Sequence, residues 1–64
     1  MPRTPQQKTA YNSLKAGLAE GLVDAQNVDR AVADVARAHM MSRWDSLVVV
    51  ERVWRDEFSI MGPN

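Results

Sequence analysis

The chain has 64 residues, with eight basic and eight acidic side chains and no cysteine. This length allows one domain, residues 1–64, whose core is marginal, since a domain of about 60 residues buries only about 60% of its unfolded surface. The lack of cysteine excludes disulfides and thiolate metal sites, and one histidine cannot hold a metal alone. We therefore expect no metal and no other cofactor, and we expect oligomerisation to supply the missing stability.

Hydropathy and charge along the chain indicate a soluble, cytoplasmic protein that does not enter membranes. The longest uninterrupted apolar run is Leu47–Val50, far shorter than a membrane span. No apolar segment of the signal-peptide type follows Arg3. Residues 1–19 carry three basic side chains and no acidic one, a charge of +3, whereas residues 20–64 carry five basic and eight acidic ones, a charge of −3. This asymmetry makes the N-terminal segment a candidate for contact with anions.

The first predicted helix runs from about residue 5 to about residue 20. Thr4 suits the N-cap, and Pro5 suits the first helical position, where its missing N–H costs nothing. Apolar side chains follow at the spacing of an amphipathic helix, namely Tyr11, Leu14, Leu18 and Leu22. Gly21 is a candidate helix end, and Gly17, which is costly inside a helix, is expected to let another helix approach closely.

The second predicted helix lies near residues 25–40, with Asp24 or Asn27 as its cap. Its narrow apolar face holds Val28, Ala31, Val32, Val35 and His39, and small side chains crowd this helix, namely Ala31, Ala33, Ala36 and Ala38. Met40 and Met41 then form a very short connection to the next helix, and such short connections favour neighbouring helices that pack on each other.

The third predicted helix lies near residues 43–61 and is the most apolar part of the chain. A strand at Leu47–Val53 competes with this interpretation, because three consecutive valines favour β structure. Helix is favoured because the apolar pattern continues for about twenty residues, longer than an ordinary strand. Ser42 also resembles a helix cap, and Gly62 with Pro63 forms a stop signal. The fold expected is therefore all-α, with three helices.

A helical wheel gives this third helix two apolar faces. The wide one, expected to face the core, holds Trp44, Leu47, Val48, Val50, Trp54, Phe58 and Met61. Val49, Val53 and Ile60 fall on nearly the opposite side, where three branched aliphatic side chains make an unlikely solvated surface. We assign these three to an interface with a second copy or another protein, and we add Trp54 because tryptophan is enriched at binding hot spots.

Four side chains are candidate contacts for nucleic acid or for a small anion such as a nucleotide. Lys8, Tyr11 and Lys15 fall on one side of the first helix, where an aromatic ring between two cations can stack on a base and hold a phosphate. Arg43 is the one base-reading side chain at the start of the third helix, so a helix-turn-helix is poorly supported. The alternative for Tyr11 is a place at the rim of the core.

No catalytic pattern is present in the sequence. The serines lack a nucleophile-elbow context, and His39, the one histidine, suits the negative end of the second helix. We expect a non-enzymatic helical interaction protein, such as an adaptor, regulator or inhibitor, that acts through oligomerisation and protein–protein contact. The alternatives are a nucleic-acid-binding regulator and an oligomer that captures a small anionic ligand.

Overall fold

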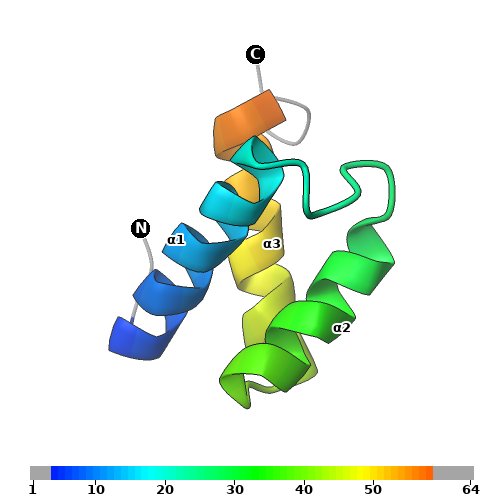
Figure 1. Cartoon of the computed structure of the whole chain (residues 1–64). Helices are drawn as coiled ribbons and strands as arrows, with labels where there is room; N and C mark the ends of the chain where they lie inside the picture. The colour runs from blue at the N-terminus through cyan, green and yellow to red at the C-terminus, as the bar shows by residue number, and fades with distance from the viewer. Residues whose placement is uncertain (1–3, 59–64) are drawn as a thin grey trace.

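The computed structural model describes residues 4–58 as three helices, α1 (Pro5–Ala19), α2 (Val28–His39) and α3 (Arg43–Phe58), which Figure 1 shows. The expectation of an all-α fold with three helices is confirmed. The competing strand at Leu47–Val53 is wrong, since that whole segment lies within α3. The predicted last turn of the third helix, up to residue 61, lies outside the described residues.

Each helix begins where the sequence supplies a capping side chain. The side-chain oxygens of Thr4, Asn27 and Ser42 each accept a hydrogen bond, 3.1 Å long, from the backbone N–H three residues later. These bonds satisfy donors that the first turn of a helix leaves without a partner. The cap at Asn27, rather than at Asp24, explains why α2 begins at Val28 and not near residue 25.

The end of α1 is set by Gly21, as expected. Its φ of 76° lies in the left-handed region, and the Leu22 N–H donates to the Gly17 carbonyl over 2.9 Å. A second bond, 3.2 Å long, runs from the Gly21 N–H to the Leu18 carbonyl, which completes a Schellman arrangement. Gly17 serves a different neighbour from the one expected. A Cβ added there would lie 3.0 Å from Cγ2 of Val23, so the close approach comes from the loop and not from another helix.

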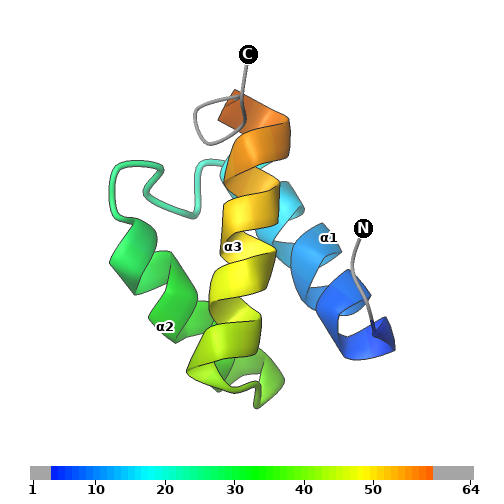
Figure 2. The same cartoon turned by 180° about the vertical axis from the view of Figure 1, so that it is seen from behind.

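The helix α3 is the central element of the fold. Both α1 and α2 pack against it, and they touch each other less than they touch α3. Figures 1 and 2 show α1 and α2 splayed apart on one side of α3, so that neither of these helices covers its other side. The core fills the space between the three helices and consists of Ala10, Leu14, Ala31, Val32, Val35, Val49, Val50, Val53 and Trp54.

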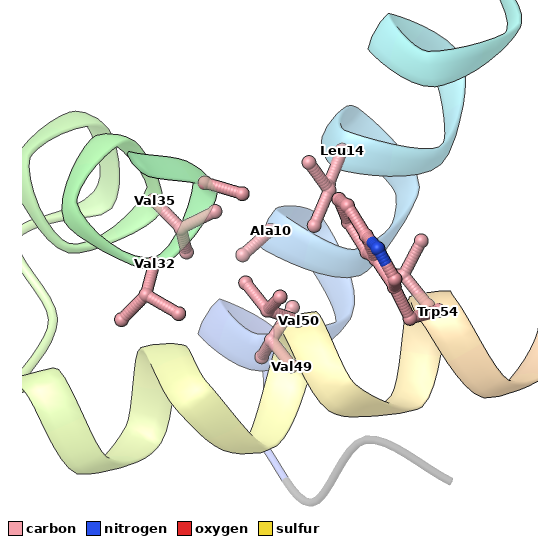
Figure 3. Close-up of a cluster of buried hydrophobic side chains, with 9 residues drawn as sticks. Ala10, Leu14, Val32, Val35, Val49, Val50 and Trp54 are labelled. Carbon is pink, nitrogen blue, oxygen red and sulfur yellow. The ribbon is translucent and has the colours of Figure 1, made fainter. Parts of the chain in front are cut away.

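Trp54 is the largest side chain of this core and links it to the first loop. Figure 3 shows its ring beside Leu14 of α1, while Val50 points toward α1 and α2 from the same helix. The indole Nε1–H donates to the backbone carbonyl of Ala25 over 3.3 Å. Burial of each such aliphatic or aromatic side chain stabilises the fold by roughly 1.5–3 kcal/mol. None of the three helices is both long and apolar enough to cross a membrane.

Candidate interaction surface

The predicted interface residues of α3 lie inside the single chain. Val49 is 3% exposed, Val53 is fully buried and Trp54 is 1% exposed, all within the core formed with α1 and α2. Side chains covered in this way offer no surface to a partner. Their assignment to an interface is therefore corrected, and Ile60, the fourth residue assigned there, lies outside the described residues.

The burial of Val49, Val53 and Trp54 has a simple geometric cause. The core-facing side of α3 is centred between the two apolar faces of the wheel, so it takes Val49 and Val53 from one face and Val50 and Trp54 from the other. A helical wheel shows which side chains share a face, but the positions of the neighbouring helices decide which face is covered. The surplus apolar surface predicted for this helix exists, but it is made of different residues.

The uncovered side of α3 carries large apolar side chains. Trp44 is 71% exposed, Val48 is 38% exposed and Phe58 is 40% exposed. Glu51 and Arg55 lie on the same side between them, and the five positions are spaced four, three, four and three residues apart. This spacing places them along one face of a helix. We call Trp44, Val48, Glu51, Arg55 and Phe58 the outer stripe.

The two charges of the outer stripe have no ion-pair partner among residues 4–58. Glu51 and Arg55 are one turn apart in the order that favours a pair, yet their charged atoms do not come within 4 Å of each other or of another opposite charge there. The next pair along the helix does form, with Arg52 Nε 3.9 Å from Asp56 Oδ2. The outer stripe therefore presents one unpaired acid and one unpaired base beside exposed apolar groups.

Met40, in the connection between α2 and α3, is even more exposed than Trp44. Its side chain is 90% exposed, and its backbone has φ 53° and ψ 45°, in the left-handed region. Glycine adopts this conformation without cost, whereas other residues are disfavoured there by about 1–2 kcal/mol. A large apolar side chain thus occupies a position where glycine would suit the backbone better and where the side chain gains little burial.

Two of the four candidate anion contacts are used inside the fold. The Tyr11 hydroxyl donates to Oδ2 of Asp56, and Lys15 Nζ lies 3.8 Å from Oε2 of Glu57. The Lys15 ammonium also lies 5.9 Å from the centre of the Tyr11 ring. These contacts join α1 to the second half of α3. Lys8 and Arg43 are exposed, so the structure does not present the four residues as one open basic cluster.

The link between Tyr11 and Asp56 changes the acidity of the phenol. The hydrogen bond to the Asp56 carboxylate raises the pKa of Tyr11 above its ordinary value of 10.0. Desolvation and the negative charges of Asp56 and Glu57 act in the same direction, and Arg52 acts against them. The phenol therefore stays protonated, and able to donate, throughout the neutral range.

Two of the hollows in the described part of the chain lie between helices. The smaller, about 150 Å³, lies between α1 and α3 beside the outer stripe and is lined by Gln7, Tyr11, Val48, Val49, Glu51, Arg52 and Arg55. The larger, about 400 Å³, lies between the splayed α1 and α2, and His39 is at its edge. Its floor is mostly apolar and includes Leu14, Val23, Ala31 and Val35. Neither hollow contains a catalytic set of side chains of the kinds considered in the sequence.

Within the described part of the chain, no three histidine or acidic side chains gather in a way that could hold a metal ion. His39 stands at the end of α2, where its backbone carbonyl accepts a short hydrogen bond from the Gln6 amide. Comparison with protein-family models, curated proteins and solved structures finds no match to this chain. The function must therefore be argued from the surface itself.

Proposed function

We propose that this chain is a non-enzymatic interaction protein that binds another protein through the outer stripe of α3. The observation that carries the proposal is Trp44, which is 71% exposed in a fold that buries its other tryptophan almost completely. Tryptophan contributes more to binding hot spots than almost any other residue, because it combines a large apolar surface with an N–H donor. An adaptor, regulator or inhibitor of this size would act through such a surface.

The neighbourhood of Trp44 supports this proposal. Val48 lies one turn further along α3, and Met40 lies in the connection just before this helix. Recognition of one helix by another uses apolar anchors at this spacing, and methionine adapts to the shape of a partner. The charges at Glu51 and Arg55 would give the contact an orientation, since a partner must match both signs.

The two alternatives receive less support from the described residues. Nucleic-acid binding was expected to use Lys8, Tyr11, Lys15 and Arg43, but Tyr11 and Lys15 already contact acidic side chains of α3. Capture of a small anion between subunits would use the same basic groups. Both remain predictions, and the experiment below distinguishes nucleic-acid binding from protein binding.

The test compares affinity-tagged wild-type protein with Trp44→Ala in capture from cells of the source organism. We expect wild type to retain a defined protein that Trp44→Ala loses. Leu22→Ala is the matched control, because Leu22 is 78% exposed but lies in the first loop and not on the outer stripe. This control should retain the same protein as wild type, and circular dichroism should show equal helix content in all three.

Two results would contradict the proposal. One is capture of the same protein by wild type and Trp44→Ala alike, which would place the contact elsewhere on the surface. The other is retention of nucleic acid that falls steeply with added salt and is lost in Lys8→Ala, because such a dependence marks phosphate contact.

A further inference from the structure

We propose that the outer stripe binds a second copy of this chain, with the two α3 helices antiparallel. This inference rests on the proposed function, since it uses the same surface and names the partner. The spacing of the stripe is the first argument. Steps of four, three, four and three residues are those of a two-helix seam, in which side chains of one helix fit between those of the other.

The charges on the stripe select the direction of the second helix. In an antiparallel pair whose twofold axis passes near residue 53, Glu51 of each chain faces Arg55 of the other. The symmetry makes this contact twice, so two acids and two bases are neutralised together. A parallel pair would place Glu51 against Glu51 and Arg55 against Arg55, and such like-charge contacts oppose association.

The same antiparallel alignment also matches the apolar side chains. Val48 of each chain faces Phe58 of the other, so the two charged layers are enclosed by two apolar layers. Trp44 lies beyond this overlap, at the outer end of the stripe. Val48 and Phe58, which are 38% and 40% exposed in the single chain, would thus be shielded from water.

The shape of the molecule leaves room for this contact. Figure 2 shows α3 in front of α1 and α2 over its full length, so neither obstructs a second helix. With the axis near residue 53, residues 48–58 of the two α3 helices overlap, and these 11 residues span about 16 Å. A seam of this length falls at the small end of specific interfaces, below about 1,200 Å² in total, so we expect a reversible dimer with micromolar affinity.

The experiment is a charge exchange followed by sedimentation equilibrium of the purified full chain. Glu51→Arg places arginine against arginine, and Arg55→Glu places glutamate against glutamate. Each single variant should weaken dimerisation by more than about tenfold. An equimolar mixture of the two should dimerise again, because each then meets the opposite charge. The double variant Glu51→Arg/Arg55→Glu should restore self-association for the same reason.

If dimerisation returns in the mixture, both variants must be folded, so a folding defect cannot explain why each alone fails to dimerise. Arg30→Glu is a control, since Arg30 is exposed on α2 and its loss should leave the dimer unchanged. The dimer inference is overturned if wild type stays monomeric up to millimolar concentration, or if it dimerises with no response to the charge exchange. If a monomer nevertheless captures a different protein through Trp44, the proposed function stands and the second copy is excluded as its partner.

Discussion

The two tryptophans show how far one residue type can differ in role within a single helix. Trp54 is buried against α1 and donates its indole N–H to Ala25, whereas Trp44, ten positions earlier, is largely exposed. Nothing in the sequence alone separates them, because both fall on the same broad apolar arc. The difference arises from the side of α3 that α1 and α2 cover. One indole therefore stabilises the fold and the other is available for contact.

At the ends of α1 and α2, backbone conformation leads to a paired prediction. Met40→Gly should raise the free energy of unfolding by about 1 kcal/mol, because glycine removes the left-handed strain and an exposed side chain loses little packing. Gly21→Ala should lower it by about 1 kcal/mol, because alanine is strained at a φ of 76°. Urea denaturation followed by circular dichroism measures both. Equal stability of all three proteins would contradict the backbone argument.

The phenol of Tyr11 gives a prediction about pH. Because its pKa is raised in the fold, its contribution to stability is complete below the ordinary value of 10.0 and is lost as pH rises through the folded pKa. The chain has one tyrosine, so the absorbance of the phenolate follows this group directly. Asp56→Asn should bring the pKa of Tyr11 back toward its ordinary value, since it removes the charge that accepts the hydrogen bond.

Glu57→Gln is the matched control for that titration. Glu57 raises the pKa of Tyr11 through its charge, but the hydrogen bond to Asp56 is the larger cause. The glutamine variant should therefore shift the titration less than the asparagine variant. A larger shift from Glu57→Gln would show that the bond between Tyr11 and Asp56 is not the main cause of the raised pKa.

At the scale of a helix, the two sides of α3 should respond differently to the same truncation. Val53→Ala should lower the free energy of unfolding by about 2 kcal/mol, because it removes two buried methyl groups and leaves a cavity. Val48→Ala, on the outer stripe, should change it by less than about 0.5 kcal/mol. Thermal and urea unfolding of the two variants at one low protein concentration check this. A larger loss of unfolding free energy from Val48→Ala than from Val53→Ala would contradict the assignment of Val53 to the side of α3 that α1 and α2 cover.

Local signals in the sequence predict the helices well, and they fail on the orientation of α3. Thr4, Asn27, Ser42 and Gly21 act through bonds to residues three or four positions away, so their effect can be inferred from the sequence alone. The direction of a face is not local. Val53 is buried only because α1 and α2 approach from its side, and that approach depends on contacts between residues far apart in the chain.

The candidate site shows the same limit. The sequence correctly indicates that α3 has more apolar surface than the described chain covers, but it assigns the excess to Val49, Val53 and Trp54 rather than to Trp44 and Val48. It also presents Tyr11 and Lys15 as contacts for an anion. Their acidic neighbours are more than forty positions away, so spacing along one helix gives no sign of them.

For the molecule as a whole, the packing of α1 and α2 on one side of α3 gives the two sides of the domain different surfaces. One side holds α1 and α2 (Figures 1 and 2), with an open groove between them, and the other side of α3 carries the outer stripe. A small domain with little core gains from any contact that covers apolar surface. Binding at the outer stripe would therefore stabilise the fold as well as perform the function.

The most direct test of this account is a nuclear magnetic resonance measurement of the two indole N–H signals. They are recorded first over a dilution series of this chain alone. They are then recorded while the chain is titrated with the partner protein that wild type, but not Trp44→Ala, retains in the capture experiment. We predict that the Trp44 signal shifts in at least one series, while the Trp54 signal, held by its bond to Ala25, stays in place. A Trp44 signal that stays unchanged in both series, or a shift confined to Trp54, would contradict the claim that the outer stripe is the binding surface.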